Sequence, residues 1–178
     1  MIPYSGPWTT EQAAHLLRRC TFGASYQQIQ YAVNLGLASA LNQLFLPSVT
    51  DEPLAYDAGE QVVNIGESWV SAVYPSNTTA NQQTEAARMK SLGAWLAKNL
   101  NQESLSLTEK MQFFWQNHFG LTTSGDARAM YHYLQLLRQH ALGNVRQLVK
   151  EVTIDPCMLV FLNGNTNTVF SPNENYGR

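Results

Sequence analysis

Apolar residues recur at helical spacing along most of the chain. Ala13, Leu16, Leu17 and Cys20, for example, share one face of the helix that this spacing predicts. No stretch alternates between apolar and polar residues for long enough to indicate a sheet. The sequence therefore predicts an all-α fold, a multi-helix array with orthogonal or bundle-like packing. Helices are expected over residues 9–20, 26–36, 37–45, 62–73, 84–100, 106–119, 127–143, 145–152 and 156–162.

Turn-forming residues separate these segments. Proline, glycine and short polar residues gather near residues 47–60, 75–82 and 163–171, and these stretches are predicted to be loops. The apolar run "CMLVFL" has no clear period, so it suits either a helix or a strand. Asp155 and Pro156 before it favour a helix, because they suit the cap and the first helical position. We expect a single helical domain over residues 1–178.

The composition excludes several classes of protein. Hydrophobic residues make up 44% of the chain, which is enough for a sizeable core. The formal net charge is −2, so the charge balance argues against nucleic acid as a partner. No run of about 18 apolar residues occurs, and no transmembrane segment is expected. The opening "MIPYSGPW" lacks the charged and apolar regions of a signal peptide, and the compartment stays unknown.

Two sets of charged side chains are candidates for chemistry. His118 lies in "FWQNHFG", where helical spacing places it on one face with Phe114 and Trp115. It suits an acid, a base or a ligand at the wall of a pocket, or alternatively a core histidine bonded to a backbone carbonyl. The adjacent Arg18 and Arg19 suit the binding of an anion or carboxylate, or alternatively a solvent-exposed face or an interhelical salt bridge.

The sequence predicts no metal site and indicates no cofactor. His15, His132 and His140 stand alone, without the spacing of paired metal ligands. Glycine-rich phosphate loops and the common hydrolase motifs are missing from the sequence as well. No assembled catalytic machinery is therefore visible in the sequence.

The chain ends in "SPNENYGR", which reads locally as the beginning of a helix. Ser171 and Glu174 have the spacing of a capping box, and a proline occupies the first helical position between them. Capping does not require Asn173, Asn175 or Tyr176. These side chains are therefore candidates for binding, because amides fix the orientation of a partner and a helix start offers N–H groups to an anion.

Together, four stretches resemble the bacterial family called domain of unknown function 1800. They are "AAHLLRRCTFG" at 13–23, "EKMQFFWQNHFG" at 109–120, "LLRQHALGNVRQLVKEV" at 136–152 and "DPCMLVFLNGNTN…PNENYGR" at 155–178. The resemblance spans nearly the whole chain and implies a mostly helical fold, but no reaction. It also implies site positions, which are Arg18, Arg19, Phe22, Gly23, Trp115, His118, Phe119, Asn173, Glu174, Asn175 and Tyr176.

The resemblance carries further expectations about this chain. In that family the terminal motif continues into a long helix, so we expect this chain to be the N-terminal portion of a longer domain. Uncovered apolar surface would then favour self-association. Many members are exported, which makes export compatible with the resemblance. Gln116 stands where many members have a second histidine, and this substitution weakens a metal site built on His118.

Two functions follow as hypotheses. The first is a helical scaffold with a polar centre formed by the R-R-x-x-F-G, W-x-x-H-F and P-N-E-N-Y motifs. The alternative is a hydrolase or lyase-like enzyme, in which His118 and Glu174 act as acid/base groups, Asn173 and Asn175 orient the substrate, and the arginine pair holds an anion. Both hypotheses predict His118 within ~10 Å of the arginine pair or of the terminal motif.

Overall fold

The computed structural model describes residues 4–101, 105–122, 126–174 and 176. These residues form eight α-helices and no strand, so the predicted all-α fold is confirmed. No helix in the described ranges combines the length and the apolar character needed to cross a membrane. The helices are α1 (Thr10–Cys20), α2 (Tyr26–Leu35), α3 (Leu37–Leu44), α4 (Thr78–Leu100), α5 (Thr108–Phe119), α6 (Ala127–Gln139), α7 (Val145–Thr153) and α8 (Pro156–Phe161), with a 3₁₀ turn at Gly164–Thr166.

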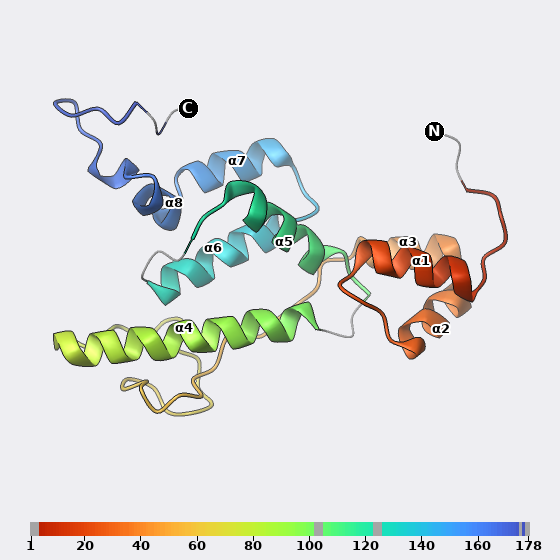
Figure 1. Cartoon of the computed structure of the whole chain (residues 1–178), viewed down its shortest axis with the longest axis horizontal. Coiled ribbons are helices and arrows are strands. Elements are labelled where there is room, and N and C mark those ends of the chain that lie inside the picture. The colour runs from red at the N-terminus through yellow and green to blue at the C-terminus, as the bar shows by residue number, and fades with distance from the viewer. Residues whose placement is uncertain (1–3, 102–104, 123–125, 175, 177–178) are drawn as a thin grey trace.

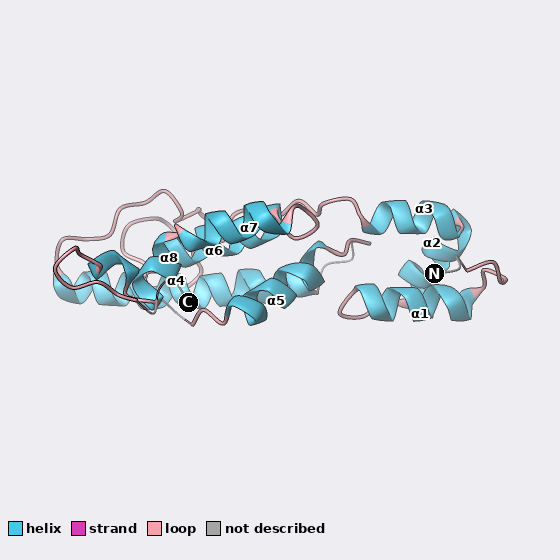
Figure 2. Ribbon diagram, turned by 90° about the horizontal axis from the view of Figure 1, so that it is seen from above, coloured by secondary structure: helices cyan, strands magenta, loops and turns pink. Residues whose placement is uncertain are grey.

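The helices form two groups with separate apolar cores. Helices α1, α2 and α3 lie at one end of the elongated molecule, and α4 to α8 make up the rest (Figures 1 and 2). The larger core is built mainly from α4, α6, α7 and α8, with Trp69 from the preceding loop fully buried in it. The smaller core contains Ala13, Leu17, Ala32, Ala40, Leu44 and Leu105. That the two groups act as one domain stays a prediction.

Side-chain caps explain where most helices begin. At the start of α2, Ser25 and Gln28 form a reciprocal capping box. Asp155 accepts hydrogen bonds from the first amides of α8, which confirms the helix predicted for "CMLVFL". Helix α5 ends at Gly120, whose φ of +63° is a conformation that other residues rarely adopt. Asn77, Asp126 and Asn144 cap α4, α6 and α7 in the same way as Asp155.

The prediction of a helix over residues 62–73 is wrong, because this segment forms turns. The carboxylate of Glu60 accepts hydrogen bonds from the amides of Val62 and Val63, at 2.9 and 3.4 Å, and so holds this segment in a turn. Three of the four apolar residues behind the prediction, Val62, Ile65 and Val73, are exposed. Only Trp69 is buried, so the helical spacing in this segment does not mark a buried helix face.

Two further boundaries differ from the prediction. The loop expected at 75–82 is helical from Thr78 onward. The side chain of Asn77 accepts a hydrogen bond from the amide of Ala80 and so caps the start of α4 there. At the other end of the chain, the described residues after Ser171 form no helix. The amides of Ser171 and Asn173 donate to Thr168 O and Asn167 Oδ1, so the preceding loop takes the amides that a helix start would present.

Candidate functional site

A cleft of about 590 Å³ lies between the last turn of α1 and the first turns of α5. Arg18 and Arg19 reach it from α1, and Phe22 from the turn that follows α1. On the α5 side, Lys110 and Phe114 belong to its lining. The cleft therefore lies between the R-R-x-x-F-G motif and the helix that carries W-x-x-H-F, although Trp115, His118 and Phe119 are not among its lining residues.

The contacts between α1 and α5 fix the geometry of the cleft. Lys110 Nζ donates to Thr21 O at 2.9 Å and to Arg18 O at 3.3 Å, which are carbonyls at the C-terminal end of α1. A cation there is favourable because the helix dipole is negative at that end. The rings of Phe22 and Phe113 meet edge to face, with centroids 5.4 Å apart. These contacts hold the two walls of the cleft together.

The lining of the cleft is cationic and aromatic. No aspartate or glutamate is among its described lining residues, whereas three cations are. Arg18 and Arg19 are exposed, and Phe22, Phe113 and Phe114 are 45%, 44% and 50% exposed. Exposed phenyl rings beside guanidinium groups are unusual on a surface that faces only water. The cleft is therefore suited to an anion that carries an apolar group.

His118 lies beside the cleft and does not line it. Its ring is 6.0 Å from that of Phe114 and within 17° of parallel to it, and its edges meet Trp115 and Phe119. The side chain is exposed, and its aromatic contacts within the described chain are with these three rings of its own helix. Its predicted distance of ~10 Å from the arginine pair or the terminal motif stays a prediction.

The terminal motif is attached to the α7–α8 region. Asn173 Nδ2 donates to Leu162 O at 2.7 Å, just after α8, and the hydroxyl of Tyr176 donates to Thr153 O, the last residue of α7. Glu174 is exposed, and Asn175 lies outside the described residues. The terminal segment is at the other end of the molecule from α1 in Figure 1. The structure thus places the R-R-x-x-F-G motif beside the helix that carries W-x-x-H-F, and the contacts of the terminal motif lie elsewhere.

A comparison with known families agrees with the motifs. Residues 15–178 match the profile of the family described as "Protein of unknown function (DUF1800)". The chain belongs to this family. No curated protein and no solved structure matches it. In this DUF1800 chain, no three described His, Cys, Asp or Glu residues are grouped so that they could hold a metal ion.

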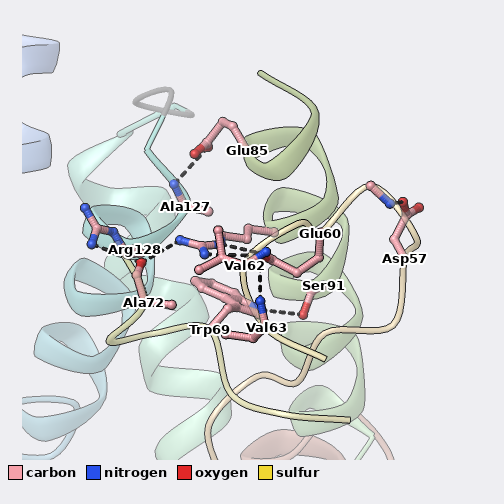
Figure 3. A network of polar contacts seen from close by, with 12 residues as sticks. Asp57, Glu60, Val62, Val63, Trp69, Ala72, Glu85, Ser91, Ala127 and Arg128 are labelled. Carbon is pink, nitrogen blue, oxygen red and sulfur yellow. Dashed lines mark hydrogen bonds and ion pairs between the residues drawn. The ribbon is translucent and has the colours of Figure 1, made fainter. Parts of the chain in front are cut away.

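Two buried ion pairs of the DUF1800 chain were not predicted from the sequence. The first joins α4 to the loop before it (Figure 3). Arg88 Nε lies 2.7 Å from Glu60 Oε2, and the two side chains are 0% and 1% exposed. Arg88 also donates to Ala72 O at 2.8 Å, and its guanidinium lies over the ring of Tyr74 at 4.4 Å. Burial raises the pKa of Glu60, but its bonds from Arg88 and two amides outweigh burial and hold this pKa below its ordinary value.

The second ion pair joins α5, α6 and the loop after α3. Both oxygens of the Glu109 carboxylate accept from Arg138 Nη1. Arg138 Nη2 donates to Ser48 Oγ at 2.8 Å, and this hydroxyl donates onward to Glu109 Oε1 at 2.7 Å. The side chains of Arg138 and Glu109 are only 4% and 9% exposed. This cluster therefore ties the end of the α1–α3 group to the larger group of helices.

A signal for the second pair was present in the sequence. Met130, Leu134 and Arg138 are four residues apart, so helical spacing places a cation on an apolar stripe of the predicted helix 127–143. Glu109 follows Ser106 by three residues, which is the spacing of a capping box, but the structure directs its carboxylate to Arg138 instead. A charge on an apolar helix face is rare unless a partner is buried with it.

Proposed function

We propose that this chain is a non-catalytic helical scaffold that binds an anionic ligand with an apolar body in the α1–α5 cleft. The proposal rests on one observation, which is that three cations and three exposed phenyl rings line the same cleft without any described carboxylate. The buried ion pairs support a role as a rigid scaffold, because they hold together segments that are far apart in the sequence. The cleft supplies the surface for recognition.

The chemistry of the lining defines the class of ligand. Arg18 and Arg19 carry planar guanidinium groups, which bind carboxylate, sulfonate or phosphate oxygens through charge-assisted hydrogen bonds. Lys110 adds positive charge, although its ammonium is already bonded to two carbonyls of the α1 end. Phe22, Phe113 and the neighbouring Phe114 offer apolar faces and edges. Clefts of roughly 300–1,000 Å³ accommodate small molecules of this kind.

A matched pair of probes tests this proposal. Naphthalene-2-sulfonate and neutral naphthalene-2-sulfonamide have nearly the same shape and differ in charge. We expect the sulfonate to bind at least about tenfold more tightly in isothermal titration calorimetry, because hydrogen bonds to charged groups contribute about 1.5–3 kcal/mol. Arg18→Gln should weaken the binding of the sulfonate about tenfold and leave the binding of the sulfonamide unchanged. Arg18 is chosen because its side chain is exposed and lines only this cleft.

The matched control is Arg146→Gln, which neutralises an exposed arginine on α7 away from the cleft. It should leave the binding of both probes unchanged. Equal affinities for sulfonate and sulfonamide would contradict the proposal, as would equal effects of the two arginine substitutions.

A further inference from the structure

A second cleft, of about 820 Å³, lies on another side of α1, between α1 and α3. Its apolar wall includes Trp8, Leu16 and Leu41. The indole N–H of Trp8 is already bonded to Ala32 O at 3.1 Å, so the ring offers the cleft only apolar surface. Leu41 is 36% exposed. Apolar surface of this kind is stabilised when a partner covers it.

Three charged or ionisable residues form a ladder along the α1 wall of this cleft. Glu11, His15 and Arg19 are four residues apart, and all three are exposed and line the cleft. With a rise of 1.5 Å per residue, Glu11 and Arg19 lie about 6 Å on either side of His15 along the helix axis. None of the three side chains makes a hydrogen bond or ion pair within the described part of the chain.

We infer that this face binds a second copy of the chain, with the two α1 helices antiparallel about a two-fold axis near His15. The order of charges along the ladder supports this partner. When two copies of α1 run in opposite directions, the acidic end of each ladder faces the basic end of the other. One two-fold axis therefore places each Glu11 opposite Arg19 of the second copy. Interfaces with two-fold symmetry are self-complementary in this way. A partner of a different kind would need its own pair of opposite charges about 12 Å apart.

The apolar residues of the cleft are suited to the same arrangement. In an antiparallel pair, the apolar side chains at the N-terminal end of one α1 lie beside those near the C-terminal end of the other. Leu16 is next to the two-fold axis, so the Leu16 side chains of the two copies lie about 3 Å apart along the helix direction, and Trp8, Tyr4 and Leu41 flank this contact. The apolar contacts provide the driving force, and the ion pairs fix the orientation.

Charge reversal tests this inference by sedimentation velocity. The wild-type chain should show a concentration-dependent dimer. Glu11→Arg alone and Arg19→Glu alone should each weaken the dimer at least about tenfold, because each places like charges opposite one another. An equimolar mixture of the two variants should recover the dimer, with one chain of each kind, because every clash becomes a pair. The double variant Glu11→Arg/Arg19→Glu should dimerise with itself.

Three outcomes would overturn the inference. They are a wild-type chain that stays monomeric at every concentration, a single variant that dimerises as the wild type does, and a mixture that stays monomeric. Both residues are exposed, so far-ultraviolet circular dichroism should show unchanged helix content in every variant. The Arg18→Gln variant should dimerise as the wild type does, which separates this interface from the ligand cleft.

Discussion

Replacing Arg138 by methionine should lower the free energy of unfolding by about 3–5 kcal/mol. The substitution leaves the buried carboxylate of Glu109 with the Ser48 hydroxyl as its remaining hydrogen-bond donor in the described part of the chain, and an uncompensated buried charge is strongly destabilising. Methionine roughly conserves the volume, so the loss reports the missing charge more than a cavity. Urea unfolding at neutral pH, followed by circular dichroism, measures the change.

The place of Arg138 gives this prediction a second readout. The Ser48 amide donates to Thr108 Oγ1 at 3.2 Å, next to the bonds that Ser48 accepts from Arg138. We expect faster hydrogen exchange at this amide in Arg138→Met, because the loop after α3 loses its attachment. Arg146→Met, on the exposed side of α7, should change stability by no more than about 0.5 kcal/mol. Equal effects of the two substitutions would show that the buried pair does not stabilise the fold.

Replacing Arg88 by methionine should also lower the free energy of unfolding by about 3–5 kcal/mol at neutral pH. Glu60 would keep its burial and its two amide bonds but lose the guanidinium. The side chain of Arg88 is fully buried, and it also bonds to Ala72 O and lies over the Tyr74 ring. Urea unfolding of the variant and the wild type at a series of pH values measures the loss.

The pH dependence distinguishes the charge effect from simple loss of packing. In the wild type the pKa of Glu60 is below its ordinary value of 4.5, so the folded state favours the carboxylate. The contribution of Glu60 to the free energy of unfolding is complete above about pH 4.5. It is lost as the pH falls through the pKa of Glu60 in the folded state. Without Arg88, burial dominates and raises this pKa above the ordinary value. The contribution of Glu60 then changes sign, and the variant should recover part of its stability as the pH falls from 7 towards 5.

The double variant Glu60→Gln/Arg88→Met is the matched control for this prediction. It removes both charges from the same buried place and should recover much of the stability at neutral pH, because a neutral pair has no charge to desolvate. Its stability should also lack the pH dependence assigned to Glu60. If Arg88→Met and the wild type differ by the same amount at every pH between 4 and 7, titration of Glu60 is not the cause.

The sequence by itself determined the helices whose signals are local. A cap at Asp155 followed by proline is sufficient to start α8, and the spacing of Leu134 and Leu137 is sufficient to define the inner face of α6. Such signals act within one or two helical turns, so they can be read without knowledge of the fold. The family resemblance was also carried by the sequence, and the match over residues 15–178 confirms it.

Only the tertiary structure decided which polar residues meet. Glu60 and Arg88 are 28 residues apart, and Arg138 and Ser48 are 90 apart. The segment 62–73 has helical spacing, yet it forms a loop because Glu60 takes its first amides and Trp69 is drawn into the core. The same holds for the α1–α5 cleft, where Arg18 and Phe113 line one cavity and Lys110 attaches α5 to the end of α1. Periodicity is a local property, whereas these contacts depend on how the helices pack against one another.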